Sequence, residues 1–387
     1  MILWHIIFWG CILLILHSYL LFPWLLQLFA GNLTLKTHKY SEEEMPPVAI
    51  LMSVYNEASI LEEKLDSLVN ASYPEGRKTI MVGSDASDDG TNEILLQYQE
   101  RYPFFHAFIY DQRQGKPAVI NAMAAEAREE ILLLTDAKVI FHRDTVTGLV
   151  RHFRDPGTGI VGGNILNESI SRDGVSIQEK AFMSREILMK YREGLIWKST
   201  IGVYGAVYAL RKSLFTPVPE GFSVDDFFIT LEVIRKGYGS ILDIDVITYE
   251  NVPNLLSEEY RRKVRIATGN FQNLGHFFPM VLTPWKGSSF AFISHKVIRW
   301  TGPFLFILLV LSNIFLYNHG EFYPYSLYAL AATVLIPFID YFLSKIGIHI
   351  VFLRFVRHFI SMNLALLNGF FNHLRGIKTN VWKPTER

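Results

Sequence analysis

The first 30 residues contain no Lys, Arg, Asp or Glu, and no other stretch limits the possible folds of this chain so strongly. An apolar run of that length can cross the ~30 Å hydrocarbon layer of a bilayer as a helix. A cleavable signal peptide is the alternative, but the stretch lacks a basic start and exceeds the ~7–15 apolar residues of a signal-peptide core. We therefore expect a retained N-terminal transmembrane helix over residues 1–30.

A C-terminal membrane region is expected over residues 296–375. Two apolar segments in it, 301–317 and 323–343, predict two spans. The next apolar stretch, 346–374, contains Arg354, Arg357 and His358 in its first half, so charges interrupt it. We expect an interfacial or re-entrant helix there, with a third C-terminal span as the alternative, and a cytoplasmic tail over 376–387.

The basic residues predict the side of the membrane on which the central segment lies. Lysines follow the first predicted span and basic residues precede the second, whereas the loop 318–322 contains no Lys or Arg. The positive-inside rule then predicts a multi-pass protein of the cell (inner) membrane with its central domain in the cytoplasm. With 37 Lys+Arg against 37 Asp+Glu, bulk charge does not point to nucleic acid as a partner.

The central segment, residues 45–285, alternates short apolar strands with amphipathic helices. Strands are predicted at 48–54 and 79–83 and within "FFHAFIYD" and "EEILLLTDAK", and a helix within "KPAVINAMAAEAR". A further β-like run covers 199–212. Strand, loop and helix in repetition predict an α/β domain with a mostly parallel central sheet. Ligands of such domains bind beyond the carboxyl ends of the strands.

Polar side chains gather in the loops that follow these strands. Neither G-x-G-x-x-G nor G-x-x-x-x-G-K-[ST] occurs there, so the loops do not have the composition of a glycine-rich phosphate cradle. Strand-end carboxylates suit a ligand rich in hydroxyl and imide N–H groups, or a divalent ion that holds a diphosphate. A nucleotide sugar offers all of these. The loop residues are Tyr55, Asn56, Glu57, Ser84, Asp85, Ser87, Asp88, Asp89 and Asp136.

Six motifs in order extend this interpretation: "PPVAILMSVYNE", "GSDASDDGT", "GKPAVINA", "TDA", "VDDF" and "RRKVRIATGN". The series resembles the membrane-integrated branch of family-2 glycosyltransferases, which includes cellulose, hyaluronan and poly-N-acetylglucosamine synthases. The resemblance covers roughly residues 45–275. It implies a GT-A (Rossmann-like) catalytic domain and an inverting hexosyl- or N-acetylhexosaminyltransferase that uses a UDP-sugar donor.

The resemblance also implies roles for residues at the strand ends. Tyr55 and Glu57 would line the nucleobase pocket, and Asp85 would hold the uracil or ribose. Lys116 would neutralise phosphate or contact the uridine, with Asn121 in support. Asp136 corresponds to the first carboxylate of the family's metal-binding motif, which implies Mg²⁺ or Mn²⁺ as cofactor.

Asp226, in "VDDFF", matches the general base of the family, and Asp225 stands where the family usually has Glu, near the acceptor. An apolar helix follows Asp226, so its carboxylate lies near a helix N-terminus and should stay ionised. The alternative is that both acids only cap that helix. Gly205 is expected to let the backbone approach the acceptor sugar closely, with a bulge or tight packing as the alternative.

Arg262 and Arg265 fall in the place of the Gln and Arg of the family's Q-x-x-R-W motif. Helical spacing places both on one face, where guanidinium groups could clamp a nucleotide diphosphate. The other interpretation is a basic amphipathic helix on anionic lipid, a role also open to Arg261 and Lys263. Interfacial helices are therefore expected near 258–295.

Two departures from the family pattern affect the predicted function. Lys138 replaces the second Asp of the metal motif, and a protonated Lys cannot coordinate a divalent ion, so we expect retained but weakened metal dependence. Ile266 replaces the Trp that would follow Arg265, which removes a stacking platform for an acceptor sugar. We expect transfer to a growing polysaccharide at the cytoplasmic face, with export as an option. Two alternatives are non-processive transfer to a lipid-linked or short glycan acceptor, and a non-catalytic nucleotide-sensing scaffold.

Overall fold

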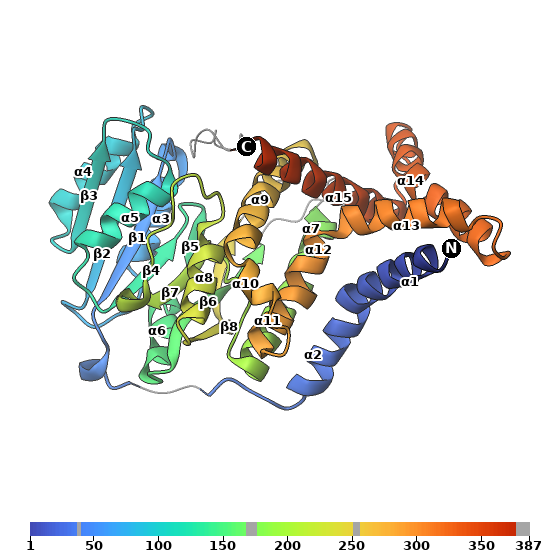
Figure 1. Cartoon of the computed structure of the whole chain (residues 1–387). Coiled ribbons are helices and arrows are strands. Elements are labelled where there is room, and N and C mark those ends of the chain that lie inside the picture. The colour runs from blue at the N-terminus through green and yellow to red at the C-terminus, as the bar shows by residue number, and fades with distance from the viewer. Residues whose placement is uncertain (37–39, 168–175, 251–255, 377–387) are drawn as a thin grey trace. The chain divides into compact units, whose positions relative to one another are not determined.

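The computed structural model describes residues 1–36, 40–167, 176–250 and 256–376 (Figure 1). The chain divides into two compact units, and each is described by itself. The helical unit consists of Met1–Leu28, Ser171–Met183 and Pro253–Gly376. The sheet unit consists of Phe29–Ile170, Ser184–Val252 and Ile377–Arg387.

The sheet unit is built on an eight-stranded sheet with the strand order β3-β2-β1-β4-β7-β6-β8-β5. Strands β3, β2, β1 and β4 run parallel, as do β6 and β8, whereas β7 is antiparallel to β4 and β6, and β5 is antiparallel to β8. The predicted α/β class with a mostly parallel sheet is confirmed. The strands are β1 (Val48–Val54), β2 (Lys78–Asp85), β3 (Phe105–Tyr110), β4 (Ile131–Thr135), β5 (Val139–Phe141), β6 (Thr158–Asn167), β7 (Val207–Arg211) and β8 (Gly239–Glu250).

Helices of the sheet unit follow the strands as the sequence pattern predicts. Strand β1 is buried along almost its whole length because helices cover both faces of a parallel sheet, which explains its continuous apolar run. Leu61, Leu65 and Leu68 of α3 pack into the same core as β1. The helices are α3 (Ala58–Val69), α4 (Thr91–Arg101), α5 (Lys116–Glu126), α6 (Thr145–Val150) and α8 (Asp225–Arg235), with short 3₁₀ turns at Glu42–Glu44, Arg151–Arg154 and Lys212–Leu214.

The β-like run predicted across 199–212 is shorter than expected, since only β7 is a strand and a loop precedes it. Helix α7 (Ser176–Trp197) holds this loop: the Thr200 hydroxyl donates to the Lys190 carbonyl at 2.9 Å. Gly202 has a φ of +78°, and a Cβ there would lie 2.4 Å from the Phe227 ring. A left-handed turn against a buried ring requires glycine at this position.

Among its described residues, the helical unit contains two helices long and apolar enough to cross a membrane, namely Ile2–Ala30 and Phe322–Lys345. The segment predicted as a span at 301–317 includes the second limb of a bent pair, Gly287–Trp300 with Gly302–Leu316, with 64° between the limbs. The pair would be a third span if both limbs cross as one, so the span at 301–317 stays a prediction. The elements are α1 (Ile2–Leu16), η1 (His17–Leu21), α2 (Phe22–Ala30), α9 (Leu256–His276), α10 (Phe278–Val281), α11 (Gly287–Phe292), η5 (Ile293–Val297), α12 (Ile298–Trp300), α13 (Gly302–Leu316), α14 (Phe322–Lys345) and α15 (Val351–Arg375).

Polar contacts join distant parts of the helical unit. Segments η1 and η5, both π-helical, meet where the Ser18 hydroxyl donates to the Ser294 carbonyl at 2.7 Å. Arg299 donates to the Ser18 carbonyl at 3.1 Å, and Arg357 of α15 pairs with the buried Asp340 of α14 at 3.0 Å. Helix α15 occupies most of the predicted stretch 346–374 and is not among the candidate spans, so its interfacial placement stays a prediction.

Candidate functional site

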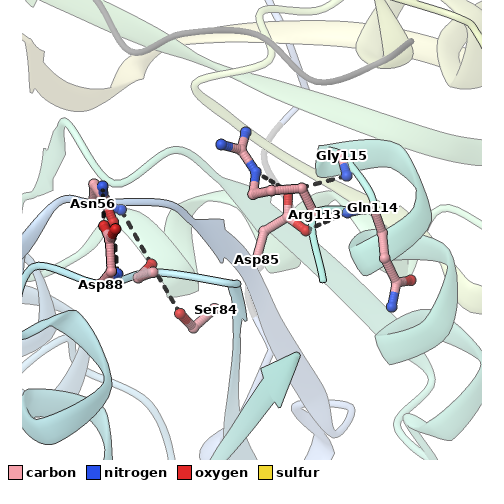
Figure 2. A network of polar contacts seen from close by, with 8 residues as sticks. Asn56, Ser84, Asp85, Asp88, Arg113, Gln114 and Gly115 are labelled. Carbon is pink, nitrogen blue, oxygen red and sulfur yellow. Dashed lines mark hydrogen bonds and ion pairs between the residues drawn. The ribbon is translucent and has the colours of Figure 1, made fainter. Parts of the chain in front are cut away.

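The loops after β1 and β2 are joined by side-chain hydrogen bonds (Figure 2). The Asn56 side-chain amide donates to Asp88 Oδ1 at 2.7 Å, and the Asp88 N–H donates back to Asn56 Oδ1 at 3.0 Å. The Ala58 N–H donates to Asp89 Oδ2 at 3.1 Å. Asp88 and Asp89, two of the predicted loop carboxylates, therefore brace the rim of the site.

Asp85, at the end of β2, accepts three hydrogen bonds from the segment that leads into α5 (Figure 2). The donors are the Gln114 N–H at 2.6 Å, the Gly115 N–H at 3.0 Å and Arg113 Nε at 3.1 Å. A carboxylate has about four lone-pair sites, so about one acceptor position remains for a ribose or base. Asp85 thus fixes the start of α5, and its role toward a nucleotide stays a prediction.

Arg113 is a site residue that the sequence motifs do not reveal. Its guanidinium lies 3.3 Å from the ring centre of Tyr55, which is the residue predicted to line the nucleobase pocket. An arginine over an aromatic face occupies the position that a stacking base would take. A bound base would therefore either stack on the Arg113 plane or displace it from Tyr55.

Lys116, the first residue of α5, connects the predicted metal and acceptor residues. Its Nζ lies 2.7 Å from Asp136 Oδ1 and 3.6 Å from Asp225 Oδ2. Burial lowers the pKa of Lys116, but the Asp136 and Asp225 carboxylates outweigh burial and raise the pKa above its ordinary value. The ammonium therefore stays charged at the carboxyl end of β4, beside the partly exposed Asp136.

Asp226 lies in the first turn of α8, with its carboxylate against the backbone of Gly205. A Cβ on Gly205 would be 3.1 Å from Asp226 Oδ2, so glycine keeps this approach open. Burial, and then the neighbouring Asp225, raise the pKa of Asp226 to about 6, although Lys116 and Lys190 lower it. The structure thus places four predicted residues together: Lys116, Asp136, Asp225 and Asp226.

Two buried polar atoms in this cluster have no hydrogen-bond partner among the described residues. They are Asp225 Oδ2 and the hydroxyl of Tyr208, a residue of β7 that the sequence motifs do not reveal. Burial, and then the charges of Asp225, Asp226 and Asp136, raise the pKa of Tyr208 well above its ordinary value. Unsatisfied buried polar atoms are costly, so these two groups suit a site that a ligand completes.

The same residues offer a partial set of ligands for a divalent ion. No group of three or more His, Cys, Asp or Glu that could hold a metal occurs among the described residues. Asp136 and Asp225 nevertheless face one ammonium group, so a cation already lies between two carboxylates. The residues fit an ion that takes most of its oxygen ligands from a diphosphate and water.

Lys64 supports the turn that carries Asp136, and it too was absent from the motifs. Its fully buried Nζ donates to Thr135 Oγ1 at 3.0 Å and to the Val139 carbonyl, on either side of the turn. The ring centre of Phe141 lies 4.0 Å from the same nitrogen. Lys138 lies in this turn and is partly buried.

The other predicted site residues are Glu57, Asn121, Arg262 and Arg265. Glu57 lies at the N-cap of α3. Both groups of the Asn121 amide bond to the Val218 backbone at 2.9 Å, so its proposed support of a nucleotide stays a prediction. Arg262 and Arg265 belong to α9 of the helical unit, where Arg262 lies 3.6 Å from Glu259.

Comparisons with known proteins relate the chain to glycosyltransferases. Residues 49–216 match the model of Glycosyl transferase family 2. The probable glycosyltransferase YdaM of Bacillus subtilis is 24% identical over 242 residues, which cover 59% of this chain and 56% of YdaM. Poly-beta-1,6-N-acetyl-D-glucosamine synthase of Staphylococcus epidermidis is 22% identical over 300 residues, which cover 75% of this chain and 71% of that protein. This chain thus spans little more than half of the first of these relatives.

Among solved structures, the mannosyltransferase PcManGT from Pyrobaculum calidifontis, in complex with GDP-Man and Mn²⁺, superposes with a TM-score of 0.70 at 20% identity. The superposition covers 94% of this chain and 97% of that one, and at this identity it shows the fold alone. The predicted GT-A fold is confirmed, and the match to Glycosyl transferase family 2 supports the predicted glycosyltransferase class, whereas the sugar transferred and the inversion stay predictions. The chain carries a family-2 glycosyltransferase domain on a GT-A-like fold.

Proposed function

We propose that the sheet unit transfers a sugar from a nucleotide sugar to an acceptor hydroxyl with inversion, and that Asp226 is the general base. The observation that most supports this proposal is the position of the Asp226 carboxylate beside the Lys116, Asp136 and Asp225 cluster. Inverting transfer needs a carboxylate within reach of the acceptor hydroxyl and positive charge near the departing diphosphate. Both kinds of group occur in this cluster.

In the proposed reaction, Asp226 accepts the proton of the acceptor hydroxyl while that oxygen bonds to the anomeric carbon of the donor sugar. The bond from this carbon to the diphosphate breaks, and the nucleoside diphosphate leaves. Lys116, at the N-terminus of α5, stabilises the negative charge on the leaving group. With a pKa of about 6, Asp226 is mostly ionised at neutral pH and close to the value that favours proton transfer.

A divalent ion, Mg²⁺ or Mn²⁺, would offset diphosphate charge when bound. Asp136 is the residue proposed to hold it, with Asp225 as a second carboxylate. Lys138 stands where the family pattern has a second metal-binding Asp, so we propose weakened metal dependence. Nucleotide release in the presence of EDTA tests this, because undiminished turnover would contradict the metal assignment. Lys138→Asp, assayed across Mg²⁺ and Mn²⁺ concentrations, should lower the metal concentration needed for half-maximal rate.

The proposed donor is a UDP-sugar, with Tyr55, Glu57 and Asp85 at the nucleoside and Arg262 or Arg265 at the diphosphate. The proposed product is a growing polysaccharide, which is supported by the motif resemblance and by the similarity to poly-N-acetylglucosamine synthases. Ile266 in place of a stacking Trp favours a second candidate, non-processive transfer to a lipid-linked or short glycan acceptor. Product mass distinguishes the two candidates.

The proposed location is the cell (inner) membrane, with several spans and the sheet unit in the cytoplasm. The two candidate spans and the bent helix pair support membrane association. The asymmetry of basic residues around the predicted spans supports the orientation. Labelling of an introduced cysteine, Asp245→Cys, in sealed cells with a membrane-impermeant reagent tests it, since a cytoplasmic sheet unit should be protected until lysis.

The decisive experiment uses the full chain in nanodiscs with a panel of UDP-sugars and GDP-mannose, and measures nucleotide release and product mass. Asp226→Asn should abolish transfer while nucleotide binding survives. Asp245→Asn removes an exposed carboxylate of the same unit and should leave the rate unchanged. If Asp226→Asn transferred sugar as fast as its control, the general-base assignment would be wrong. Nucleotide binding without release by the unmodified protein would favour a scaffold.

A further inference from the structure

A groove of about 410 Å³ lies between α9 and α15, both within the helical unit. None of its lining residues is acidic, and the proposed transfer reaction uses none of them. Hydrogen-bond donors dominate the lining: two guanidinium groups, two side-chain amides and one phenol. The lining residues are Tyr260, Arg261, Val264, Asn368, Asn372 and Arg375.

The two arginines give the groove a positive charge that no carboxylate among the described residues balances. Neither Arg261 nor Arg375 pairs with a carboxylate among the described residues. The buried Glu259 lies 3.1 Å from Lys263 and 3.6 Å from Arg262, so it is shared between two other cations of α9. Two unpaired guanidinium groups facing one groove favour an anion with several oxygens, because their planar forks match such geometry.

The groove has firm walls because α9 and α15 pack closely. A Cβ on Gly369 of α15 would lie 2.4 Å from the Ala267 Cβ of α9, which leaves no room for a larger side chain. The rings of Phe271 and Phe370 meet edge to face, 5.2 Å apart. Asn368 of α15 donates to the Tyr260 hydroxyl of α9 across the groove. A groove held by such contacts needs little reorganisation to bind a ligand.

An exposed apolar stripe on α15 borders this cationic groove. Phe352, Leu364, Phe371 and Leu374 are each 46% to 67% exposed, and Leu374 immediately precedes Arg375. A helix with one strongly apolar exposed face and basic residues beside it is suited to the interface of a bilayer. A ligand held here would place its anionic group on the arginines and could extend an apolar chain along Phe371 and Leu374.

We propose that the groove between α9 and α15 binds the phosphate head group of a membrane lipid. Arg261 and Arg375 would bond the phosphate oxygens, and the Asn372 amide would add a donor. Free phosphate shares the head-group chemistry but gains nothing from the apolar stripe. This inference rests on the membrane placement proposed above, and it does not depend on the transfer reaction.

The test measures lipid binding rather than activity. The full chain is incorporated into phosphatidylcholine nanodiscs with increasing phosphatidylglycerol, and the bound phosphatidylglycerol is counted by native mass spectrometry after release. Arg261→Gln combined with Arg375→Gln should weaken retention about 30-fold, since each basic side chain near an anionic lipid contributes about fivefold. Lys286→Gln combined with Lys345→Gln removes the same charge from exposed positions outside the groove and should retain the lipid.

Equal losses in the two double variants would overturn the inference, because they would indicate attraction by overall charge. Undiminished retention in the arginine variant would also overturn it. Competition by inorganic phosphate at concentrations matched to the lipid would show that the apolar chain contributes nothing, which contradicts a lipid site. If the chain failed to enter nanodiscs at all, the membrane placement itself would be wrong. Both arginines are exposed, so the variants should fold as the unmodified chain does.

Discussion

The rate of glycosyl transfer should depend on the ionisation of Asp226 in a measurable way. Burial and the neighbouring Asp225 raise the pKa of Asp226 to about 6, from an ordinary value of about 3.9. A general base works only when it is unprotonated, so kcat/KM should fall as pH drops through about 6. At about pH 5 roughly a tenth of the enzyme carries the ionised base, and each further pH unit costs about tenfold.

Two substitutions should move this midpoint in opposite directions. Asp225→Asn removes the neighbouring negative charge while leaving the burial of Asp226, so the midpoint should shift below 6. Lys190→Met removes a buried positive charge that lowers the pKa of Asp226, so the midpoint should shift upwards. General damage to the fold would not separate the two variants in this manner.

The assay is nucleotide release at limiting donor from about pH 4.5 to about pH 8, with thermal unfolding followed at each pH. Variants are compared by the pH at the midpoint of the acid limb and not by the maximal rate. Asp225 also lies 3.6 Å from Lys116, so its substitution can change the maximal rate for a separate reason. An acid limb centred near 4 in the unmodified enzyme would refute the reasoning. So would midpoints of Asp225→Asn and Lys190→Met that shift in the same direction.

Three further predictions concern residues behind the site. Gly202→Ala should lower the stability of the sheet unit by about 2–4 kcal/mol, since strain at φ +78° adds to a clash with a buried ring. Gly76→Ala, at φ +71° in open space, should cost only about 1 kcal/mol in the same denaturant titration. Hydrogen bonds from His152 and Arg151 outweigh burial and lower the pKa of Asp243 to about 2. About 2–3 kcal/mol of stability that is present above pH 4 should therefore be lost as pH falls through 2. Unfolding of Asp243→Asn, measured across the same pH range, should lack this loss. Lys64→Met should reduce kcat about 10–100-fold with nearly unchanged donor KM, because the turn that carries Asp136 loses its support. An unchanged kcat in steady-state kinetics would contradict this prediction.

Much of the parallel half of the sheet could be predicted from the sequence. The strand expected at 48–54 coincides with β1, because an apolar run between polar loops marks a strand buried on both faces. The predicted strands do not include β6 and β8. Their pairing joins residues about 80 positions apart, as Gly162 with Leu242, and such contacts depend on the whole fold rather than on local pattern.

The site residues likewise include some that the sequence predicts and some that it does not. Lys116, Asp136, Asp225 and Asp226 could be predicted from motif order, and the structure brings them together. The positions of Arg113 and Tyr208 could not, because the fold brings Arg113 onto Tyr55, and Tyr208 near Asp136, across long stretches of chain. Lys64 did leave a signal.

That signal is the position of Lys64 on the core face of its helix. It lies three residues after Leu61 and four before Leu68, both of which are fully buried. Lysine is rarely placed at such a position without a polar partner inside the protein. A charged residue in an otherwise apolar stripe is therefore a reason to look for a buried hydrogen-bond acceptor nearby, here the Thr135 hydroxyl.

The contact between η1 and η5 has a consequence for the N-terminal helix. Within lipid, apolar side chains gain little by leaving one apolar neighbour for another, so polar contacts and close packing decide how helices pair. The bond from Ser18 to the Ser294 carbonyl, and that from Arg299 to the Ser18 carbonyl, set both the rotation and the depth of the first helix against its neighbour. With the first helix in a bilayer, as proposed above, a foreign hydrophobic helix of equal length would still anchor the chain but would lack these contacts with η5 and Arg299. The first helix is thus a specific structural part and not an interchangeable tether.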